Sequence, residues 1–144
     1  RARSAVTRAL VVDTSALLAT LLAEHSRDAV LVALSEAETA LISSCCLLEA
    51  SIVTTSRLGS PGQAELDHLL DVFAVEVVSF TSDQAALAAE AWRRFGKGRH
   101  RAALNILDCC SYALAESRGL PLLAVGDDYA RAGVETVDLR LVAA

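Results

Sequence analysis

Aromatic residues are scarce in this sequence and long hydrophobic runs are missing. Aromatics make up 4% of the 144 residues, whereas hydrophobic residues make up 53%, so we expect a core built from Leu, Val, Ile and Ala. No apolar run approaches the ~18 residues of a membrane span, and the first one is too short for a signal peptide and ends in an acid. We therefore expect one cytoplasmic domain over residues 1–144, with its core at about 10–138.

Metal-binding and redox cysteine motifs are also missing. The four cysteines form two adjacent pairs, Cys45-Cys46 and Cys109-Cys110, and neither pair has C-x-x-C spacing. Both pairs lie in apolar segments that read as helices, where cysteine acts as a small hydrophobe. We expect all four to be reduced core residues, which suits the cytoplasm. The three histidines show no ligand spacing, so zinc is disfavoured.

Positive charge is in short supply overall, since the net charge is −5, but it is concentrated in one segment. That segment contains no acid, and its cations are Arg93, Arg94, Lys97, Arg99 and Arg101. Gly96 and Gly98 suit a flexible loop, and such a loop can contact phosphates without reading sequence. A solvated charge run is the alternative. Trp92 and Tyr112 could stack on bases, although we favour packing in the core for both.

Apolar strands alternate with helical patterns along the chain. The predicted strands are 9–12, 39–43, 75–80 and 121–125, with a possible fifth at 134–137; the predicted helices are 14–24, 27–38, 44–58, 63–73, 84–95 and 105–117. This alternation predicts an α/β fold whose mostly parallel sheet, of four to five strands, carries helices on both faces.

Asp13 directly follows the first apolar strand. In open α/β sheets, ligands bind at the carboxyl ends of the strands, so Asp13 is a candidate site residue. Taken alone, it could instead cap the next helix. Thr14 and Ser15 offer hydroxyls that could orient a carboxylate or contact phosphate, although helix capping is the simpler interpretation.

Two further acids stand in apolar surroundings. Glu49 has Cys45, Cys46, Ile52 and Val53 as its helix-face neighbours, and an unpaired carboxylate is expensive to bury there. Asp108 lies in the first turn of a helix that is apolar nearly all round. For Glu49, the alternative is a half-exposed or Arg-paired side chain. For Asp108, the alternative is a reciprocal helix cap with Asn105.

Asp127 and Asp128 follow the fourth predicted strand, so four segments deliver acids to one edge of the sheet. Two charges 4 Å apart repel by about 4 kcal/mol at an effective dielectric of 20. Such a cluster is tolerable when it binds a hard cation, and Mg²⁺ or Mn²⁺ prefers carboxylate oxygens and water.

These residues, in this order, resemble the PIN domain and, more narrowly, the VapC ribonuclease toxins of type II toxin–antitoxin pairs. The resemblance rests on Val-Val-Asp13-Thr-Ser-Ala-Leu, the mid-helix Glu49, Leu-Asn-Ile-Leu-Asp108-Cys and the strand–Gly-Asp-Asp-Tyr turn. It spans about residues 10–137 and implies a PIN-like three-layer fold. The family often has Thr-x-Asp in that turn. This chain has no Thr there, so we favour Asp128 over Asp127 as the fourth acid.

The resemblance implies an Mg²⁺-dependent endoribonuclease in which Asp13, Asp108, Glu49 and Asp128 bind metal. It also implies a cognate VapB-type antitoxin over the acidic groove. A homodimer through the first helices is expected, giving a heterotetramer or larger assembly with the antitoxin. An apolar stripe could serve either contact or the core: Leu17, Leu18, Leu21 and Leu22.

Three other readings stay open. A receiver-like signalling module would need a lysine at a later strand end, but the only lysine is Lys97 in the Gly-rich segment. A catalytically inactive PIN-like scaffold of RNA processing would lack metal binding. A structure-specific DNA nuclease shares the metal chemistry but usually needs a longer chain.

Overall fold

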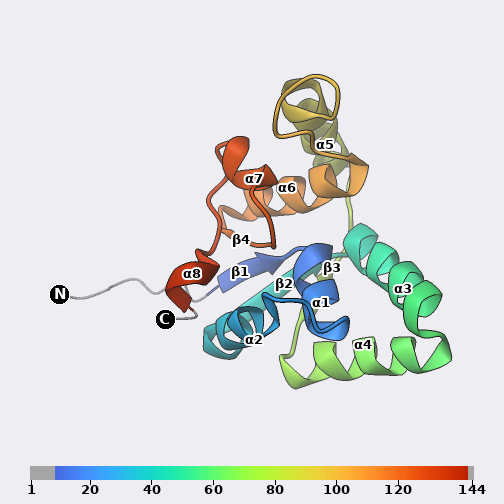
Figure 1. The fold of residues 1–144 in the computed structure, drawn as a ribbon. Helices are drawn as coiled ribbons and strands as arrows, with labels where there is room; N and C mark the ends of the chain where they lie inside the picture. The colour runs from blue at the N-terminus through green and yellow to red at the C-terminus, as the bar shows by residue number, and fades with distance from the viewer. Residues whose placement is uncertain (1–8, 143–144) are drawn as a thin grey trace.

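The computed structural model, which describes residues 9–142, contains a four-stranded parallel sheet (Figure 1). Its strands are β1 (Ala9–Val12), β2 (Thr39–Ser43), β3 (Glu76–Val78) and β4 (Leu122–Leu123). They are arranged in the order β3-β2-β1-β4, and every pairing is parallel. The predicted α/β class is therefore confirmed for the described residues. The ends of the expected 1–144 domain, residues 1–8 and 143–144, lie outside them.

Six helices fall close to the predicted segments, whereas two short ones, Asp128–Arg131 and Leu139–Val142, were not predicted. The helices are α1 (Thr14–Leu21), α2 (Arg27–Glu36), α3 (Ser44–Leu58), α4 (Ser60–Val72), α5 (Ser82–Phe95), α6 (Ile106–Arg118), α7 (Asp128–Arg131) and α8 (Leu139–Val142). Within residues 9–142, no helix combines the length and apolar character that crossing a membrane requires.

The possible fifth strand at 134–137 is not formed. In its place, an isolated parallel bridge pairs Leu122 with Thr136 through two hydrogen bonds. Leu122 N–H donates to the Glu135 carbonyl at 3.0 Å, and Val137 N–H donates to the Leu122 carbonyl at 2.9 Å. Because β4 has only two residues, it provides too few backbone groups to extend this pairing into a strand.

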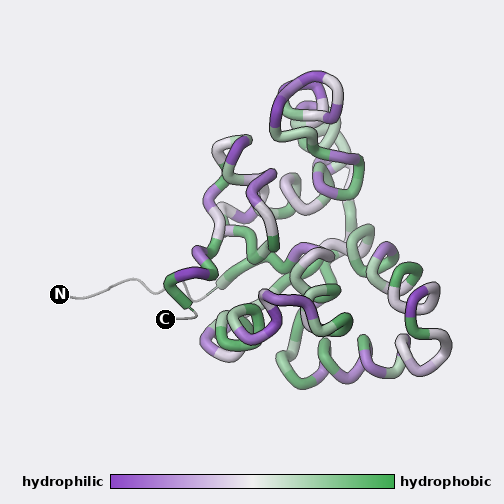
Figure 2. Tube along the Cα trace, in the orientation of Figure 1, coloured by the Kyte–Doolittle hydropathy of each residue, from purple (hydrophilic) through white to green (hydrophobic). Residues whose placement is uncertain are grey.

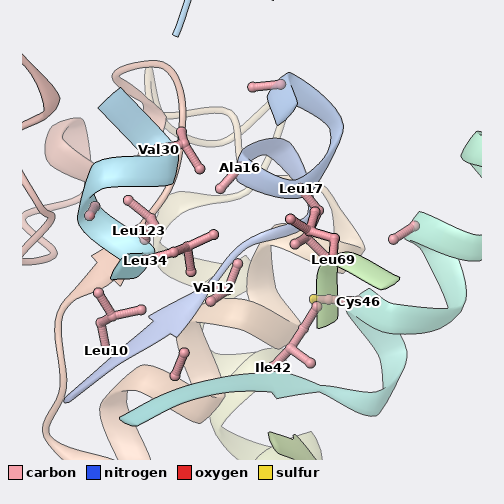
Figure 3. Close-up of a cluster of buried hydrophobic side chains, with 14 of the residues drawn as sticks. Leu10, Val12, Ala16, Leu17, Val30, Leu34, Ile42, Cys46, Leu69 and Leu123 are labelled. Atoms are coloured by element: carbon pink, nitrogen blue, oxygen red, sulfur yellow. The ribbon is translucent and has the colours of Figure 1, made fainter. Parts of the chain in front are cut away.

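Alternate side chains of β1 fill two separate cores. Leu10 and Val12 pack with residues of α1, α2, α3 and α4 on one face of the sheet (Figure 3). Val11 points to the other face, among residues of α5, α6 and α7. All three side chains are at most 3% exposed, so the unbroken apolar run reflects a strand covered on both sides.

The cysteines belong to these cores, as expected. All four are free thiols; Cys46, Cys109 and Cys110 are buried, and Cys45 is half-buried. Cys46 Sγ lies 3.1 Å from Ser111 Oγ, which links α3 to α6. Burial raises the pKa of Cys46 and of Cys110 to about 12, and that of Cys109 to about 11.

The strand order changes direction next to β1. The chain adds β2 and then β3 on one side of β1, with α1 to α4 as connections, and later places β4 on the other side (Figure 1). The carboxyl ends of β1 and β4 therefore flank a topological switch point, the position where open α/β sheets bind ligands.

Candidate active site

Asp13 lies at the switch point with its carboxylate fully engaged. The residue is 5% exposed, and its N–H donates to the Leu123 carbonyl of β4 at 2.9 Å. Oδ2 accepts from Ser15 N–H at 3.0 Å and from Ser15 Oγ at 2.6 Å. Oδ1 accepts from Ser111 Oγ and from Tyr129 Oη, both at 2.7 Å. Asp13 is thus both the α1 N-cap and the centre of a buried polar network.

The hydroxyls of Thr14 and Ser15, which follow Asp13, have different roles. Ser15 Oγ donates to the Asp13 carboxylate and accepts from Val125 N–H at 3.0 Å, so it orients the acid and ties α1 to the end of β4. Thr14 is buried, and its Oγ1 donates to the Cys46 carbonyl at 3.0 Å. The predicted orienting role therefore falls to Ser15, whereas Thr14 holds α1 against α3.

Asp108 lies in the first turn of α6, where it forms a reciprocal cap with Asn105. Its side chain also lies near that of Asp13. Asn105 N–H donates to Asp108 Oδ2 and Asp108 N–H donates to Asn105 Oδ1, each at 2.9 Å. Burial is the largest cause that raises the pKa of Asp108, to about 6; the Asn105 N–H opposes it, and the Asp13 charge adds to it. The capping alternative is correct, and the same side chain still lies beside Asp13.

Tyr129 bridges the two acids, and sequence reasoning missed it. Its hydroxyl, from α7, donates to Asp13 Oδ1 and lies 3.3 Å from both Asp108 Oδ1 and the Asp108 carbonyl. Burial and the charges of Asp13 and Asp108 raise the pKa of Tyr129 well above its usual value. Ser111 was missed too; a hydroxyl on the buried face of an otherwise apolar helix was the available signal.

Glu49 lies close to this network without joining it. It is half-buried on α3 and lines a small groove of about 170 Å³ with Cys45 and Leu107. Its charge contributes to the raised pKa values of Cys46 and Cys110. The Glu49 side chain forms no hydrogen bond or ion pair with residues 9–142, so the Arg-paired alternative is wrong and the half-exposed alternative is correct.

Asp127 and Asp128 are exposed at the start of α7. Asp128 forms an ion pair with Arg131 at 3.4 Å, and its charge adds to the raised pKa of Asp108. Asp127 is the α7 N-cap residue, and its side chain makes no capping hydrogen bond.

The expected four-acid cluster is therefore not drawn together. No group of three or more His, Cys, Asp or Glu side chains in the described part of the chain is placed to hold a metal ion. Like charges repel, and the acids have other partners: Asp13 has four donors, Asp108 has its cap, and Asp128 has Arg131. The structure brings together two of the predicted acids, Asp13 and Asp108, through one hydroxyl.

The paired acids fit a magnesium ion by the chemistry of their donors. Both side chains offer carboxylate oxygens, and both lie within hydrogen-bonding distance of the same Tyr129 oxygen. Mg²⁺ is usually held by one or two carboxylates, with waters and substrate phosphates completing its shell. Asp13 and Asp108 could supply such ligands, with Glu49 and Asp128 near enough to affect the same electrostatic environment.

The basic segment is held in place rather than loose. Lys97 N–H donates to the Leu104 carbonyl at 2.9 Å, and Leu104 N–H donates to the Phe95 carbonyl at 3.0 Å. Gly96 is buried, and a Cβ there would lie 2.5 Å from Trp92 Cδ1. Gly96, expected to be a flexible point of the loop, is instead packed against Trp92. Figure 2 shows mostly hydrophilic colouring at the end of α5 and in the turn that follows it.

Arginines of the basic segment lie over aromatic rings. The Arg99 guanidinium is 5.0 Å from the Trp92 ring centre, and that of Arg94 is 4.7 Å from the Phe95 ring centre. Trp92 is 42% exposed, so the core packing expected for it is wrong. Tyr112 is half-buried and packs on Phe95 at a centroid distance of 6.1 Å.

An apolar groove is lined both by residues of the basic segment and by the sequence neighbours of Asp108. It has a volume of about 920 Å³, and helices α3, α5 and α6 supply most of its lining. Three of its side chains are markedly exposed: Leu48 at 61%, Trp92 at 42% and Ile106 at 73%. Arg93 and Arg99 also line it. Arg93 forms an ion pair with Glu90 at 3.0 Å, whereas Arg99 lies over the Trp92 ring.

Comparisons with known proteins agree with this arrangement. The family model described as "PIN domain" matches residues 10–135. Ribonuclease VapC30 of Mycobacterium tuberculosis is 43% identical over 130 residues, covering 90% of this chain and 99% of that protein. The chain therefore belongs to the PIN-domain family, in its VapC branch. This assignment excludes the receiver-like alternative.

Solved structures share the fold. The structure of Mycobacterium tuberculosis VapC20, described as a sarcin–ricin loop cleaving toxin, superposes with a TM-score of 0.72 at 21% identity, covering 89% of this chain and 98% of that one. VapBC2 from Rickettsia felis, bound to a fragment of promoter DNA, gives 0.71 at 16% identity, with coverages of 90% and 97%. At these identities the likeness shows the fold alone.

Proposed function

We propose that this protein is a Mg²⁺-dependent endoribonuclease that acts as the toxin of a type II toxin–antitoxin pair in the cytoplasm. The observation that carries the proposal is the meeting of Asp13 and Asp108 at the switch point of the sheet, joined by the Tyr129 hydroxyl. Membership of the VapC branch, whose named relatives are ribonucleases, supports RNA as the substrate.

Asp13 and Asp108 would hold the metal in this proposal. Glu49 would orient the attacking water, and Asp128 or Asp127 would complete the acidic surface. Bound Mg²⁺ supplies an activated water and offsets the negative charge that develops on the phosphate. Ser15 holds the Asp13 carboxylate in one orientation through its 2.6 Å bond, so that acid is already ordered for binding.

The basic segment would hold the RNA backbone. Lys97, Arg94 and Arg101 are exposed and form no ion pair with any residue in the described part of the chain. Cations of this kind position nucleic acid through phosphate contacts without reading bases. Trp92 offers a partly exposed ring beside them, which suits stacking on an unpaired base.

The apolar groove supports an antitoxin partner. An apolar groove that Arg99 also lines matches an amphipathic antitoxin helix with apolar anchors and an acidic residue beside them. Because Leu107 and Cys109 flank Asp108 and line the same groove, a helix bound there would cover the approach to the acids. A chain of this fold also occurs in a structure described as a toxin–antitoxin complex from Klebsiella pneumoniae, with a TM-score of 0.63 at 17% identity.

Fewer of the four leucines are available for the proposed homodimer contact than the sequence indicated. Leu17 is fully buried in the core and cannot contact a partner. Leu18, Leu21 and Leu22 are half-buried on or directly after α1. A groove of about 830 Å³ between α1, α2 and α4 includes Leu21, Leu31 and Phe73, and we propose this face as the dimer contact.

The enzymatic proposal is tested by RNA cleavage with purified protein. Asp13→Asn and Asp108→Asn should each lower the cleavage rate by about 100-fold or more, because charge at the reacting phosphate is no longer offset. EDTA should stop the wild type, and added Mg²⁺ should restore it.

Asp83→Asn is the matched control, since Asp83 also lies in the first turn of a helix but far along the chain from either acid. It should cleave like the wild type. Undiminished cleavage in EDTA would contradict the proposed cofactor. Metal binding without cleavage of any RNA would favour the inactive scaffold instead.

A further inference from the structure

The Asp13 carboxylate has no acceptor site to spare. A carboxylate offers about four lone-pair sites, and four protein donors reach it: two from Ser15 on Oδ2, and Ser111 and Tyr129 on Oδ1. A cation that binds Asp13 in this arrangement must therefore displace one of these donors.

The four donors are not equally replaceable. Ser15 N–H belongs to the helix cap, and Ser15 Oγ is held in turn by Val125 N–H. Ser111 Oγ lies against Cys46 Sγ, on the buried side. Tyr129 Oη is the one of the four that also reaches Asp108, at 3.3 Å from its Oδ1. A cation shared by both acids would need this position.

We propose that the Tyr129 hydroxyl competes with the divalent cation for the oxygens of Asp13 and Asp108, and thereby sets the metal affinity. This inference rests on the proposed function, which assigns the metal to these acids. Tyr129 links the two carboxylates through a neutral hydroxyl, so it reduces their repulsion and occupies their shared face. Binding of the cation requires the hydroxyl to release Asp13 Oδ1.

The experiment is Mn²⁺ binding to the full chain, measured by calorimetry. Tyr129→Phe removes only the oxygen, and it should bind Mn²⁺ about five- to tenfold more tightly, because a charge-assisted hydrogen bond no longer has to be broken. Ser111→Ala removes the other Oδ1 donor, whose hydroxyl contacts Asp13 and Cys46 but not the Asp108 carboxylate, and should not tighten binding. Unfolding midpoints in urea check that both variants are folded.

A spectroscopic readout follows the hydroxyl itself. The chain has two tyrosines, so Tyr112→Phe leaves Tyr129 alone and serves as the matched control, with wild-type Mn²⁺ affinity. In that variant, Mn²⁺ should shift the near-ultraviolet absorbance of tyrosine as Tyr129 releases the carboxylate. Tyr129→Phe should lose the shift.

The outcomes separate the two claims. If the wild type binds Mn²⁺ and Tyr129→Phe binds it equally or more weakly, the competition is refuted and the metal proposal stands. If neither protein binds Mn²⁺, the cofactor proposal fails and the competition fails with it. Tighter binding by Ser111→Ala would also overturn the role of Tyr129, because any lost donor would then suffice.

Discussion

At the scale of single residues, side chains at the switch point serve structure and site together. Asp13 caps α1 while it accepts from Ser111 and Tyr129, which belong to α6 and α7. Ser15 donates to Asp13 and accepts from Val125. A capping role and a site role are therefore compatible here, because the cap uses one carboxylate oxygen and the other faces Asp108.

Replacing Ser15 by Ala should destabilise the fold as well as the site. The change leaves Val125 N–H without its acceptor and removes one donor from Asp13, so we expect a loss of about 1–3 kcal/mol in the free energy of unfolding. Urea unfolding measures it. Ser35→Ala is the control, since Ser35 is exposed and bonds only the Val32 carbonyl. An equal effect of both substitutions would contradict the account.

The buried thiols should resist alkylation. With the pKa of Cys46 and Cys110 near 12 and that of Cys109 near 11, few thiolates exist at pH 8. We expect native protein to incorporate at most one iodoacetamide, at half-buried Cys45, and unfolded protein to incorporate four, as counted by mass spectrometry. Rapid native labelling of Cys46 would be inconsistent with its burial.

The raised thiol pKa values also determine how the stability of the fold changes with pH. The unfolded thiols release their protons near pH 9, whereas the folded ones keep them to about 11 or 12. The unfolded state therefore binds fewer protons in that window, and these thiols make the folded state less stable as pH rises above 9.

At the scale of elements, the junction of α5 and the basic segment fixes Trp92. The Gly96 N–H donates to the Trp92 carbonyl at 2.8 Å, and the Arg99 Nε donates to the Arg93 carbonyl at 3.0 Å. The turn is therefore folded back on α5, which keeps the Trp92 ring under Arg99 at the edge of the apolar groove.

Replacing Gly96 by Ala should move Trp92. The new Cβ would lie 2.5 Å from both the ring and the carbonyl of Trp92, so the turn must shift. Trp92 is the only tryptophan, and its fluorescence reports the change directly. Gly98→Ala is the control because its Cβ meets open space, despite the strain at φ +84°. Unchanged emission in Gly96→Ala would contradict the packing.

How much of the site the sequence predicts depends on how far apart in the sequence the contacting residues lie. Asp13 and Asp108 follow local patterns, an apolar strand and an apolar helix, so their positions could be predicted. The Tyr129 bond to Asp13 joins residues 116 apart, and no local pattern encodes it. Trp92 was misjudged because its burial depends on where the segment after Gly96 folds. Asp128 stays a prediction as the fourth acid.

At the scale of the whole molecule, the candidate acids and the basic segment belong to different parts of the chain. Asp13 and Asp108 meet at the switch point, whereas the cations of the basic segment lie at the end of α5 and directly after it, so a net charge of −5 does not prevent binding of RNA. The apolar groove is lined by Arg93 and Arg99 of the basic segment and by Leu107 and Cys109, the sequence neighbours of Asp108. An RNA strand held by the cations and cut at the acids would therefore have to pass the surface that we propose for the antitoxin.

Neutralising Lys97, Arg99 and Arg101 together should weaken RNA binding and flatten its dependence on salt. For single-stranded RNA the slope of log K against log salt should fall by about 2, since each phosphate contact contributes about 0.7. Binding is measured in an Asp13→Asn background to prevent cleavage. Arg57, Arg118 and Arg140, neutralised together, provide a control of equal charge. The same loss in that control would show a general charge effect.

The central claim, that Asp13 and Asp108 hold one cation together, is tested most directly by a double-mutant cycle on Mn²⁺ binding. Calorimetry compares the wild type, Asp13→Asn, Asp108→Asn and the double variant. We expect one ion per chain in the wild type, a large loss of affinity in each single variant, and little further loss in the double variant. Wild-type affinity in Asp108→Asn, or losses that simply add, would contradict a shared site.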